Sequence, residues 1–258
     1  MNGLPRFARV FGHQGVAEAY RHRPPYPDQV FAILGRLATA VPRTVLDLGA
    51  GEGALARPLA SIVERVDAVD VSAAMIAVGR SRPGGDAPNL RWIHGPAETA
   101  GADGPYALAT AGASLHWMDL APLMARLDAV LAPGAQLAIV EHGARDAPWR
   151  ERLDAVIERY SRNPDHDPAF SVVNVLGETF RRAGMAETRP VPFRQPVADF
   201  VEGLHSTSAL AREHMDARES DAFGREVAEA VGPWIRDGVL DMTVTATVTW
   251  GVPATRAR

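Results

Sequence analysis

The sequence predicts an α/β fold built on a parallel sheet, and three observations carry this prediction. Apolar, β-branched runs that suit buried strands alternate with segments of helical periodicity. The first run, 44–48, ends in a turn with three alternating glycines, Gly49, Gly51 and Gly53. A second run ends at Asp70, about 20 residues further on, which in α/β folds is the distance from a glycine turn to a carboxylate that holds ribose hydroxyls. The order of these features predicts a nucleoside-type ligand at one edge of the sheet.

The elements around the glycine turn follow in a regular order. A helix over about 26–40 has Pro27 in its first turn, where a missing N–H costs nothing. A helix over about 54–63 follows the turn, and its free N–H groups are expected to face the ligand. Ser72 is the predicted N-cap of the next helix, which carries Met75.

Further along the chain the pattern continues and then changes. Leucines at helical spacing predict a helix over 120–131. Beyond Val140 we expect helices over 149–160 and 172–183, closing strands over 187–193 and 242–250, and a mainly helical segment over 197–238.

Composition indicates an ordinary globular chain. With 258 residues, of which 47% are apolar, the chain can bury one large core. Its net charge of −4 gives no general attraction to nucleic acid or to an anionic membrane. No apolar run approaches the ~20 residues that cross a bilayer, and no secretory signal is visible. Cysteine is absent, so there is no disulfide framework. We therefore expect a cytoplasmic protein that binds neither nucleic acid nor membrane, whose oligomeric state stays open.

The glycine spacing separates two cofactor classes. A dinucleotide fold prefers Gly-x-Gly-x-x-Gly, whereas this turn reads Gly-x-Gly-x-Gly and follows Asp47. That pattern resembles motif I of the class I S-adenosylmethionine-dependent methyltransferases. The resemblance implies that the glycine loop lies against the methionine part of S-adenosyl-L-methionine, that Asp47 bonds its ammonium group and that Asp70 holds its ribose.

More segments support the resemblance. The segment 106–119, which ends in His116-Trp117-Met118-Asp119, resembles the fourth strand of a small-molecule subgroup that is marked by a His-Trp-x-Asp ending and includes trans-aconitate methyltransferases. The segments 89–98 and 131–140 similarly resemble the third strand with its loop and the turn with the fifth strand. The segment 19–27, with Tyr20 and Arg23, resembles a lid that lies over the cofactor in that subgroup. The segment 95–98 resembles a Gly-x-Ala-Glu loop that contacts adenine, although Pro96 stands where many relatives have an aspartate.

The resemblance implies a Rossmann-like, seven-stranded, mostly parallel sheet with helices on both faces and a helical cap over its carboxyl edge. It also implies a single domain, whose predicted parts are a lid over 1–26, a core of about 27–142 plus 185–258, and cap elements at about 145–184 and 197–238. The cofactor-binding residues expected on this basis are Tyr20, Arg23, Asp47, Gly49, Ala50, Gly51, Asp70, Val71, Met75, Pro96, Ala97, Glu98, Ser114 and His116.

Methyl transfer depends mainly on holding the reactants in line. A base is needed only for an acceptor that is protonated at neutral pH, and histidine has the appropriate pKa. His116 at the end of the fourth strand and His142 after the fifth are the candidate bases, and packing against the cofactor is the alternative role for His116. Asp165, His166 and Asp167 could suggest a metal, but their proline-flanked loop is typical of solvated segments, so no metal is expected.

Three functions are compatible with these patterns. The favoured one is O-, N- or C-methylation of a small-molecule acceptor, such as a natural product or a carboxylic acid. The others are a methyltransferase-like protein that binds the cofactor without methylating, and an NAD(P)-dependent oxidoreductase, which the glycine spacing disfavours.

Overall fold

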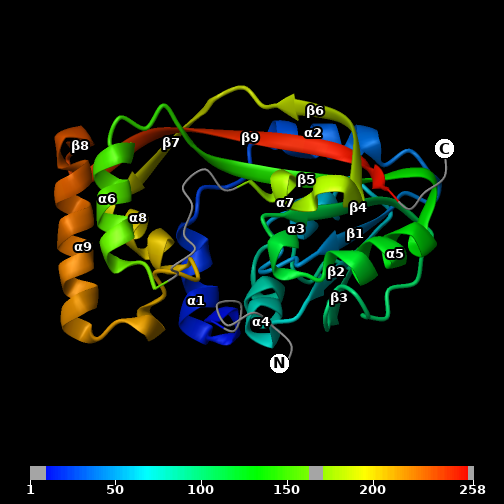
Figure 1. Ribbon diagram of the computed structural model, residues 1–258, viewed down its shortest axis with the longest axis horizontal. Coiled ribbons are helices and arrows are strands. Elements are labelled where there is room, and N and C mark those ends of the chain that lie inside the picture. The colour runs from blue at the N-terminus through cyan, green and yellow to red at the C-terminus, as the bar shows by residue number, and fades with distance from the viewer. Residues whose placement is uncertain (1–9, 163–170, 255–258) are drawn as a thin grey trace. The chain divides into compact units, whose positions relative to one another are not determined.

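The computed structural model describes residues 10–162 and 171–254. The chain forms two compact units (Figure 1). We call them the sheet unit, which comprises 26–142, 171–189 and 246–258, and the helical unit, which comprises 1–25, 143–170 and 190–245. Two of these boundaries lie close to the predicted ends of the lid and of the first core segment. The segment 171–189, however, groups with the sheet unit rather than with the cap.

The predicted α/β fold class is confirmed, with a sheet somewhat larger than expected. Within residues 10–162 and 171–254 the sheet has nine strands, seven of them in the order β3-β2-β1-β4-β5-β9-β6, while β7 and β8 also pair with β9. The strands are β1 (Thr44–Leu48), β2 (Arg65–Asp70), β3 (Leu90–His94), β4 (Tyr106–Gly112), β5 (Leu131–Arg145), β6 (Phe180–Glu187), β7 (Val191–Pro196), β8 (Ile235–Arg236) and β9 (Val239–Pro253). The strands from β3 to β5 pair in parallel, and β6, β7 and β8 pair antiparallel with β9.

Helices cover both faces of the sheet unit. Successive residues of β1 point to opposite faces, so Val45 lies in one hydrophobic cluster and Leu46 in the other. The cluster around Val45 includes residues of α2 (Asp28–Leu37) and α3 (Ala56–Leu59). The cluster around Leu46 includes residues of α5 (Leu120–Val130) and α7 (Val172–Leu176). Burial on both sides explains why these strands read as continuous apolar runs.

Three predicted helices are shorter in the structure. The helix expected over about 26–40 is α2, which covers only Asp28–Leu37. The helix expected over 54–63 contains only the four α-helical residues of α3, flanked by turns. The helix expected over 172–183 ends at Leu176, because Gly177 adopts a left-handed φ of 47° and the chain enters β6 at Phe180. The strand expected to begin at 187 therefore begins earlier, and β7 follows it after a short break.

The ends of other elements agree with the predicted signals. Ser72 caps α4 (Ala73–Ser81) by accepting a hydrogen bond from the Met75 backbone N–H. The helix predicted over 149–160 is α6 (Arg150–Tyr160).

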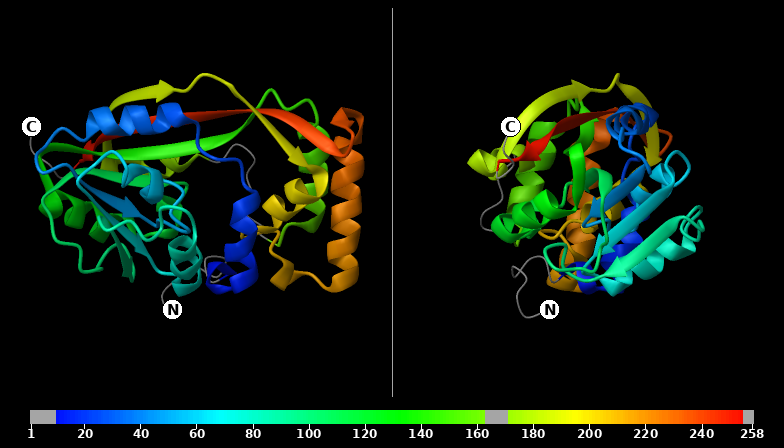
Figure 2. Two further views of the ribbon diagram at one scale, coloured as in Figure 1. Left: turned by 180° about the vertical axis from the view of Figure 1, so that it is seen from behind. Right: turned by 90° about the vertical axis from the view of Figure 1, so that its right-hand side faces the viewer.

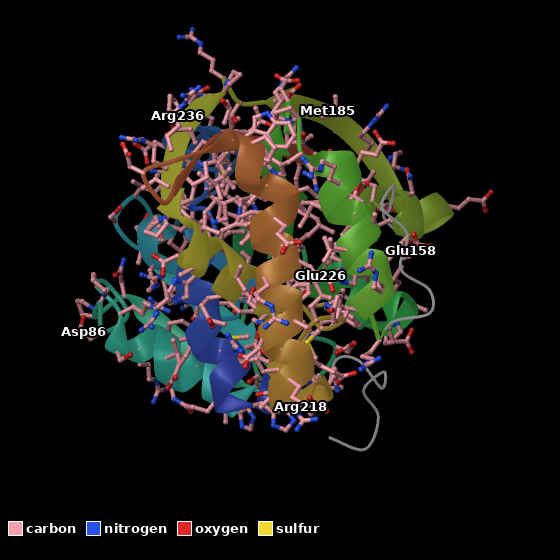
Figure 3. All side chains as sticks on the ribbon, turned by 90° about the vertical axis from the view of Figure 1, so that its left-hand side faces the viewer. Asp86, Glu158, Met185, Arg218, Glu226 and Arg236 are labelled. Atoms are coloured by element: carbon pink, nitrogen blue, oxygen red, sulfur yellow. The ribbon has the colours of Figure 1, made fainter. Side chains whose placement is uncertain are left out.

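The helical unit has its own apolar core. Its helices within the described residues are α1 (Gln14–Ala19), η2 (Tyr20–His22), α6, α8 (Val197–His205), η5 (Arg212–His214), α9 (Ala217–Val231) and η6 (Gly232–Trp234). Helices α6 and α9 pack side by side (Figure 2). Glu226, labelled in Figure 3, joins them by pairing with Arg159 and accepting a hydrogen bond from Tyr160. An Asp216–Glu219 capping box starts α9.

Among the residues that the structure describes, no helix has the length and apolar character needed to span a bilayer.

Candidate functional site

The glycine turn after β1 is left-handed at all three glycines, with φ values of 62°, 58° and 82° at Gly49, Gly51 and Gly53. A Cβ on Gly49 would lie 2.6 Å from the Ser114 Cβ, and one on Gly53 would lie 2.6 Å from the Trp92 ring. A Cβ on Gly51 would have no described atom within 4 Å. Gly49 and Gly53 therefore allow close packing inside the protein, whereas Gly51 presents its backbone to open space.

Asp70, at the end of β2, ties this turn to the neighbouring strand. Its Oδ2 accepts a hydrogen bond of 2.7 Å from the Gly51 N–H, and its Oδ1 accepts one of 2.7 Å from the Ser72 N–H. Burial raises the pKa of the Asp70 carboxyl, and these two N–H donors oppose that rise. Each carboxylate oxygen keeps one further lone pair, so the group can still accept bonds from ligand hydroxyls.

Asp47, inside β1, is the most unusual group near the turn. It is buried, and its Oδ1 accepts a hydrogen bond of 2.7 Å from the Thr110 hydroxyl on β4. Its Oδ2 forms no hydrogen bond with the described residues. Burial raises the pKa of Asp47 to about 7, the Thr110 hydroxyl lowers it, the charge of Asp70 raises it and the nearby Ala56 backbone N–H lowers it. A buried carboxyl with an unsatisfied oxygen is costly unless a ligand supplies a donor or a positive charge.

A buried cluster of ion pairs, which the sequence did not reveal, holds the glycine turn in place. The Glu52 carboxylate pairs with Arg57 at 2.8 Å and with Arg82 at 2.9 Å. Arg57 also donates to the Glu52 carbonyl and to the Pro83 carbonyl. The cluster joins the glycine turn to α3 and to the end of α4. No sequence motif marks this cluster, because ion pairs on the surface produce the same pattern of acidic and basic residues.

Backbone groups of the turn are largely used within the protein. The Ala50 N–H donates to the Val69 carbonyl, and the Gly53 N–H donates to the Ala50 carbonyl. The helix α3, which was expected to present its N–H groups to a ligand, has only four α-helical residues. This geometry differs from a dinucleotide fold, in which the pyrophosphate sits at a long helix N-terminus.

The residues expected near an adenine ring have mixed surroundings. Met75 and Ala97 are buried, whereas Pro96 is exposed. The half-buried Glu98 accepts a hydrogen bond of 2.8 Å from the Asp119 N–H and so holds the start of α5. The Val71 carbonyl pairs with the His94 ring at 3.1 Å. Their role toward a ligand stays a prediction.

Ser114 and His116 both follow β4, and Ser114 lies beside the glycine turn. The buried Ser114 hydroxyl donates a 2.6 Å hydrogen bond to the Leu48 carbonyl, so it braces the end of β1. His116 lies in η3 (Leu115–Trp117), with its ring 4.5 Å from the Trp117 ring. Burial lowers the pKa of His116 to about 4, so the ring is neutral near pH 7.

His142 lies within β5 rather than after it, because β5 continues to Arg145. Its ring is half-buried, and its centroid lies 4.1 Å from that of Tyr26 at an interplanar angle of 42°. The Glu141 carboxylate points instead toward α7, where it accepts hydrogen bonds from Ser171 and the Val172 N–H. The alternation of β5 therefore directs His142 and Glu141 to opposite faces.

Tyr20 and Arg23 belong to the helical unit. The Arg23 guanidinium lies 4.0 Å from the centre of the Tyr20 ring and donates to the hydroxyl and the carbonyl of Ser206. These contacts hold the segment within its own unit, and its relation to the glycine turn stays a prediction.

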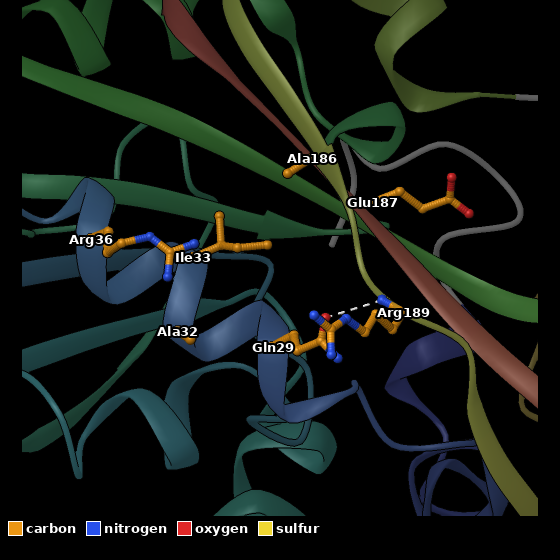
Figure 4. A pocket seen from close by; sticks show the side chains of 7 residues that line it. All are labelled: Gln29, Ala32, Ile33, Arg36, Ala186, Glu187 and Arg189. Atoms are coloured by element: carbon orange, nitrogen blue, oxygen red, sulfur yellow. Dashed lines mark hydrogen bonds between the residues drawn. The ribbon is translucent and has the colours of Figure 1, made fainter.

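The loop with Asp165, His166 and Asp167 lies outside the described residues. Elsewhere in 10–162 and 171–254, no group of three or more histidine, aspartate or glutamate side chains is placed to hold a metal. A groove of about 480 Å³ in the sheet unit lies between α2 and β6 and shares no residue with the glycine turn (Figure 4). There the Gln29 side chain accepts a hydrogen bond from the Arg189 N–H.

Comparison with known proteins supports the family resemblance. Residues 45–134 match the family model of a methyltransferase domain. A trans-aconitate 2-methyltransferase from a Mycobacterium species is 32% identical over 155 residues, which is 57% of each chain. An uncharacterised methyltransferase from Mycobacterium bovis is 32% identical over 42% of this chain and 55% of its own length. The chain thus spans little more than half the length of these curated relatives.

Solved structures resemble a larger part of the chain. A protein from Anaeromyxobacter dehalogenans, assigned provisionally as a type II methyltransferase, is 27% identical with a TM-score of 0.65 and covers 89% of this chain and 97% of its own. A methyltransferase from Geobacter sulfurreducens, solved with S-adenosyl-L-homocysteine, is 19% identical with a TM-score of 0.55 and covers 98% of this chain and 100% of its own. These similarities confirm the resemblance predicted from the glycine turn and the strand pattern.

Proposed function

We propose, from the premise that residues 45–134 form a methyltransferase domain, that this protein transfers the methyl group of S-adenosyl-L-methionine to a small-molecule acceptor. The observation that carries the proposal is the state of Asp47. This carboxyl is buried beside an open glycine turn, and its Oδ2 forms no hydrogen bond with described residues. A positively charged amino group is the partner that would stabilise it.

The remaining residues suit the rest of the same cofactor. Gly51 offers open space for close approach of the methionine chain. Asp70 has lone pairs left for two ribose hydroxyls, and its position is fixed by the N–H groups of Gly51 and Ser72. Val71, Met75, Pro96, Ala97 and Glu98 would line the adenine side, and Ser114 and His116 would complete the part of the site that the sheet unit contains.

When bound, the cofactor supplies an already activated methyl group on a sulfonium. The protein then has to hold the acceptor in line with that methyl group and exclude water. Good orientation alone can supply an effective molarity on the order of 10⁵ M or more.

Where the acceptor carries a proton, we assign the base to His142 rather than to His116. A ring whose pKa is about 4 holds a proton weakly, so His116 is a poor base at neutral pH. The half-buried His142 on β5 lies at the carboxyl edge of the parallel strands, where ligands bind in open α/β sheets. A carboxylate acceptor would need neither histidine.

A small molecule is the acceptor class that the charge supports. The net charge of −4 gives no attraction to polyanions such as nucleic acid. Similarity to a trans-aconitate 2-methyltransferase also supports a small acceptor such as a carboxylic acid or a natural product. We further propose a cytoplasmic location, since the chain has no cysteine and therefore no disulfide of the kind common in secreted proteins.

The test is calorimetric titration of the protein with S-adenosyl-L-homocysteine and, separately, with NADH. We expect binding of the first alone, and at least a tenfold loss of its affinity in Asp70→Asn. Asp86→Asn, which changes an exposed carboxylate in the same unit, is the matched control and should bind normally. Binding of NADH alone, or of neither compound, would overturn the proposal.

A further inference from the structure

Gly112, the last residue of β4, has an unusual neighbour. A Cβ at this position would lie 2.5 Å from the Tyr26 hydroxyl oxygen, 3.0 Å from the Leu55 Cδ1 and 3.4 Å from the Tyr26 Cζ. The φ of Gly112 is not among the left-handed values, so the backbone alone would accept any residue. Glycine weakens a strand and often marks a place where another group approaches closely. Here that group is the phenol hydroxyl of Tyr26.

The same tyrosine contacts His142. Its ring centroid lies 4.1 Å from that of the imidazole, and the ring packs against the hydrophobic cluster that contains Val140 and Leu55. The Tyr26 ring thus packs against the apolar cluster, and its hydroxyl fills the space over Gly112. An aromatic ring held in this way restricts the orientation of a neighbouring imidazole.

We propose that Tyr26 is a positioning residue, which fixes the orientation of the His142 ring at the carboxyl edge of the sheet because its hydroxyl occupies the space that Gly112 leaves open. The inference rests on the proposed function only for the use of His142 as a base. The contact itself lies within the sheet unit and can be tested without any acceptor.

The first test is a double-mutant cycle on thermal stability. Gly112→Ala places a methyl group against the Tyr26 hydroxyl, and we expect Tm to fall by roughly 5 °C or more, as overpacking does in a domain of this size. Tyr26→Phe removes the hydroxyl, so Gly112→Ala in that background should cost less than half as much. An equal loss of Tm in both backgrounds would refute the place assigned to the hydroxyl.

The second test reads the His142 ring directly by NMR, with His142→Gln used to assign its proton signals. Tyr26→Leu removes the ring current of the phenol, so the His142 signals should shift markedly. Tyr26→Phe keeps the ring and should keep most of the wild-type shift. A His142 signal that does not respond to Tyr26→Leu would overturn the positioning role, even if the variant were less stable.

The proposed function and the positioning role of Tyr26 can be refuted independently of each other. If the wild-type protein does not bind S-adenosyl-L-homocysteine, the proposed function fails while the NMR response still decides the role of Tyr26. Once an acceptor that needs a base is known, Tyr26→Leu should lower kcat.

Discussion

Asp47→Asn should make the ligand-free protein progressively more stable, relative to wild type, as pH rises. The wild-type carboxyl has its pKa raised from 3.8 to about 7 in the folded state. Between these two values the folded protein binds more protons than the unfolded chain, so the wild-type free energy of unfolding falls as pH rises through this window. The asparagine does not titrate and escapes this loss.

The magnitude follows from the pKa difference. A shift of about three units corresponds to roughly 4 kcal/mol once the pH exceeds both values. Between pH 5 and 8.5 the advantage of Asp47→Asn over wild type should therefore grow by about 2–3 kcal/mol. The buried amide of the asparagine adds a cost of about 1–3 kcal/mol that does not depend on pH, so the change with pH is the quantity to compare.

The assay is urea unfolding of both proteins without ligand at several pH values across this range. Asp86→Asn, which changes an exposed carboxylate in the same unit, serves as the control. Excess S-adenosyl-L-homocysteine should stabilise wild type and leave Asp47→Asn nearly unchanged, since the variant lacks the charge that we assign to the ammonium group. A stability difference that stays constant from pH 5 to 8.5 would refute the view that Asp47 is a carboxyl whose pKa is raised by burial.

Three further predictions concern the glycine turn. Glu52→Gln breaks two ion pairs and should lower the free energy of unfolding, measured in urea, by about 1–3 kcal/mol. Glu178→Gln, which changes an exposed carboxylate, should leave this free energy unchanged. Equal effects of the two substitutions would contradict the role of Glu52 in holding the glycine turn. Gly53→Ala clashes with an indole ring and should lower Tm more than Gly51→Ala does. Gly51→Ala should instead reduce the affinity for S-adenosyl-L-homocysteine measured by calorimetry. A larger loss of Tm in Gly51→Ala than in Gly53→Ala would contradict the assignment of open space to Gly51. Thr110→Val removes the hydrogen bond that the Asp47 carboxylate accepts and so raises the folded-state pKa of Asp47 further, and the decline of stability with pH should continue to a higher pH. An unchanged profile would show that this bond does not stabilise the charge.

Local patterns were enough to predict the glycine turn, the N-cap at Ser72 and the run of parallel strands. Each depends on residues within a few positions of one another, where backbone sterics and periodicity act directly. The same reasoning was wrong about the helix expected over 172–183. Its apolar pattern is compatible with helix or strand, and pairing of β6 with β9 decided between them from Phe180 onward.

The sequence by itself determined the α/β fold class and placed two carboxylates, Asp47 and Asp70, beside the turn, because strand periodicity and glycine spacing are written in adjacent residues. Only the tertiary structure decided the burial and the hydrogen-bond partners of those carboxylates. Thr110 is 63 positions from Asp47 in the chain, and the Tyr26 hydroxyl meets Gly112 across 86 positions. Burial, pKa and close packing arise from such distant neighbours, which meet only when the strands assemble into a sheet and bring their carboxyl ends to one edge.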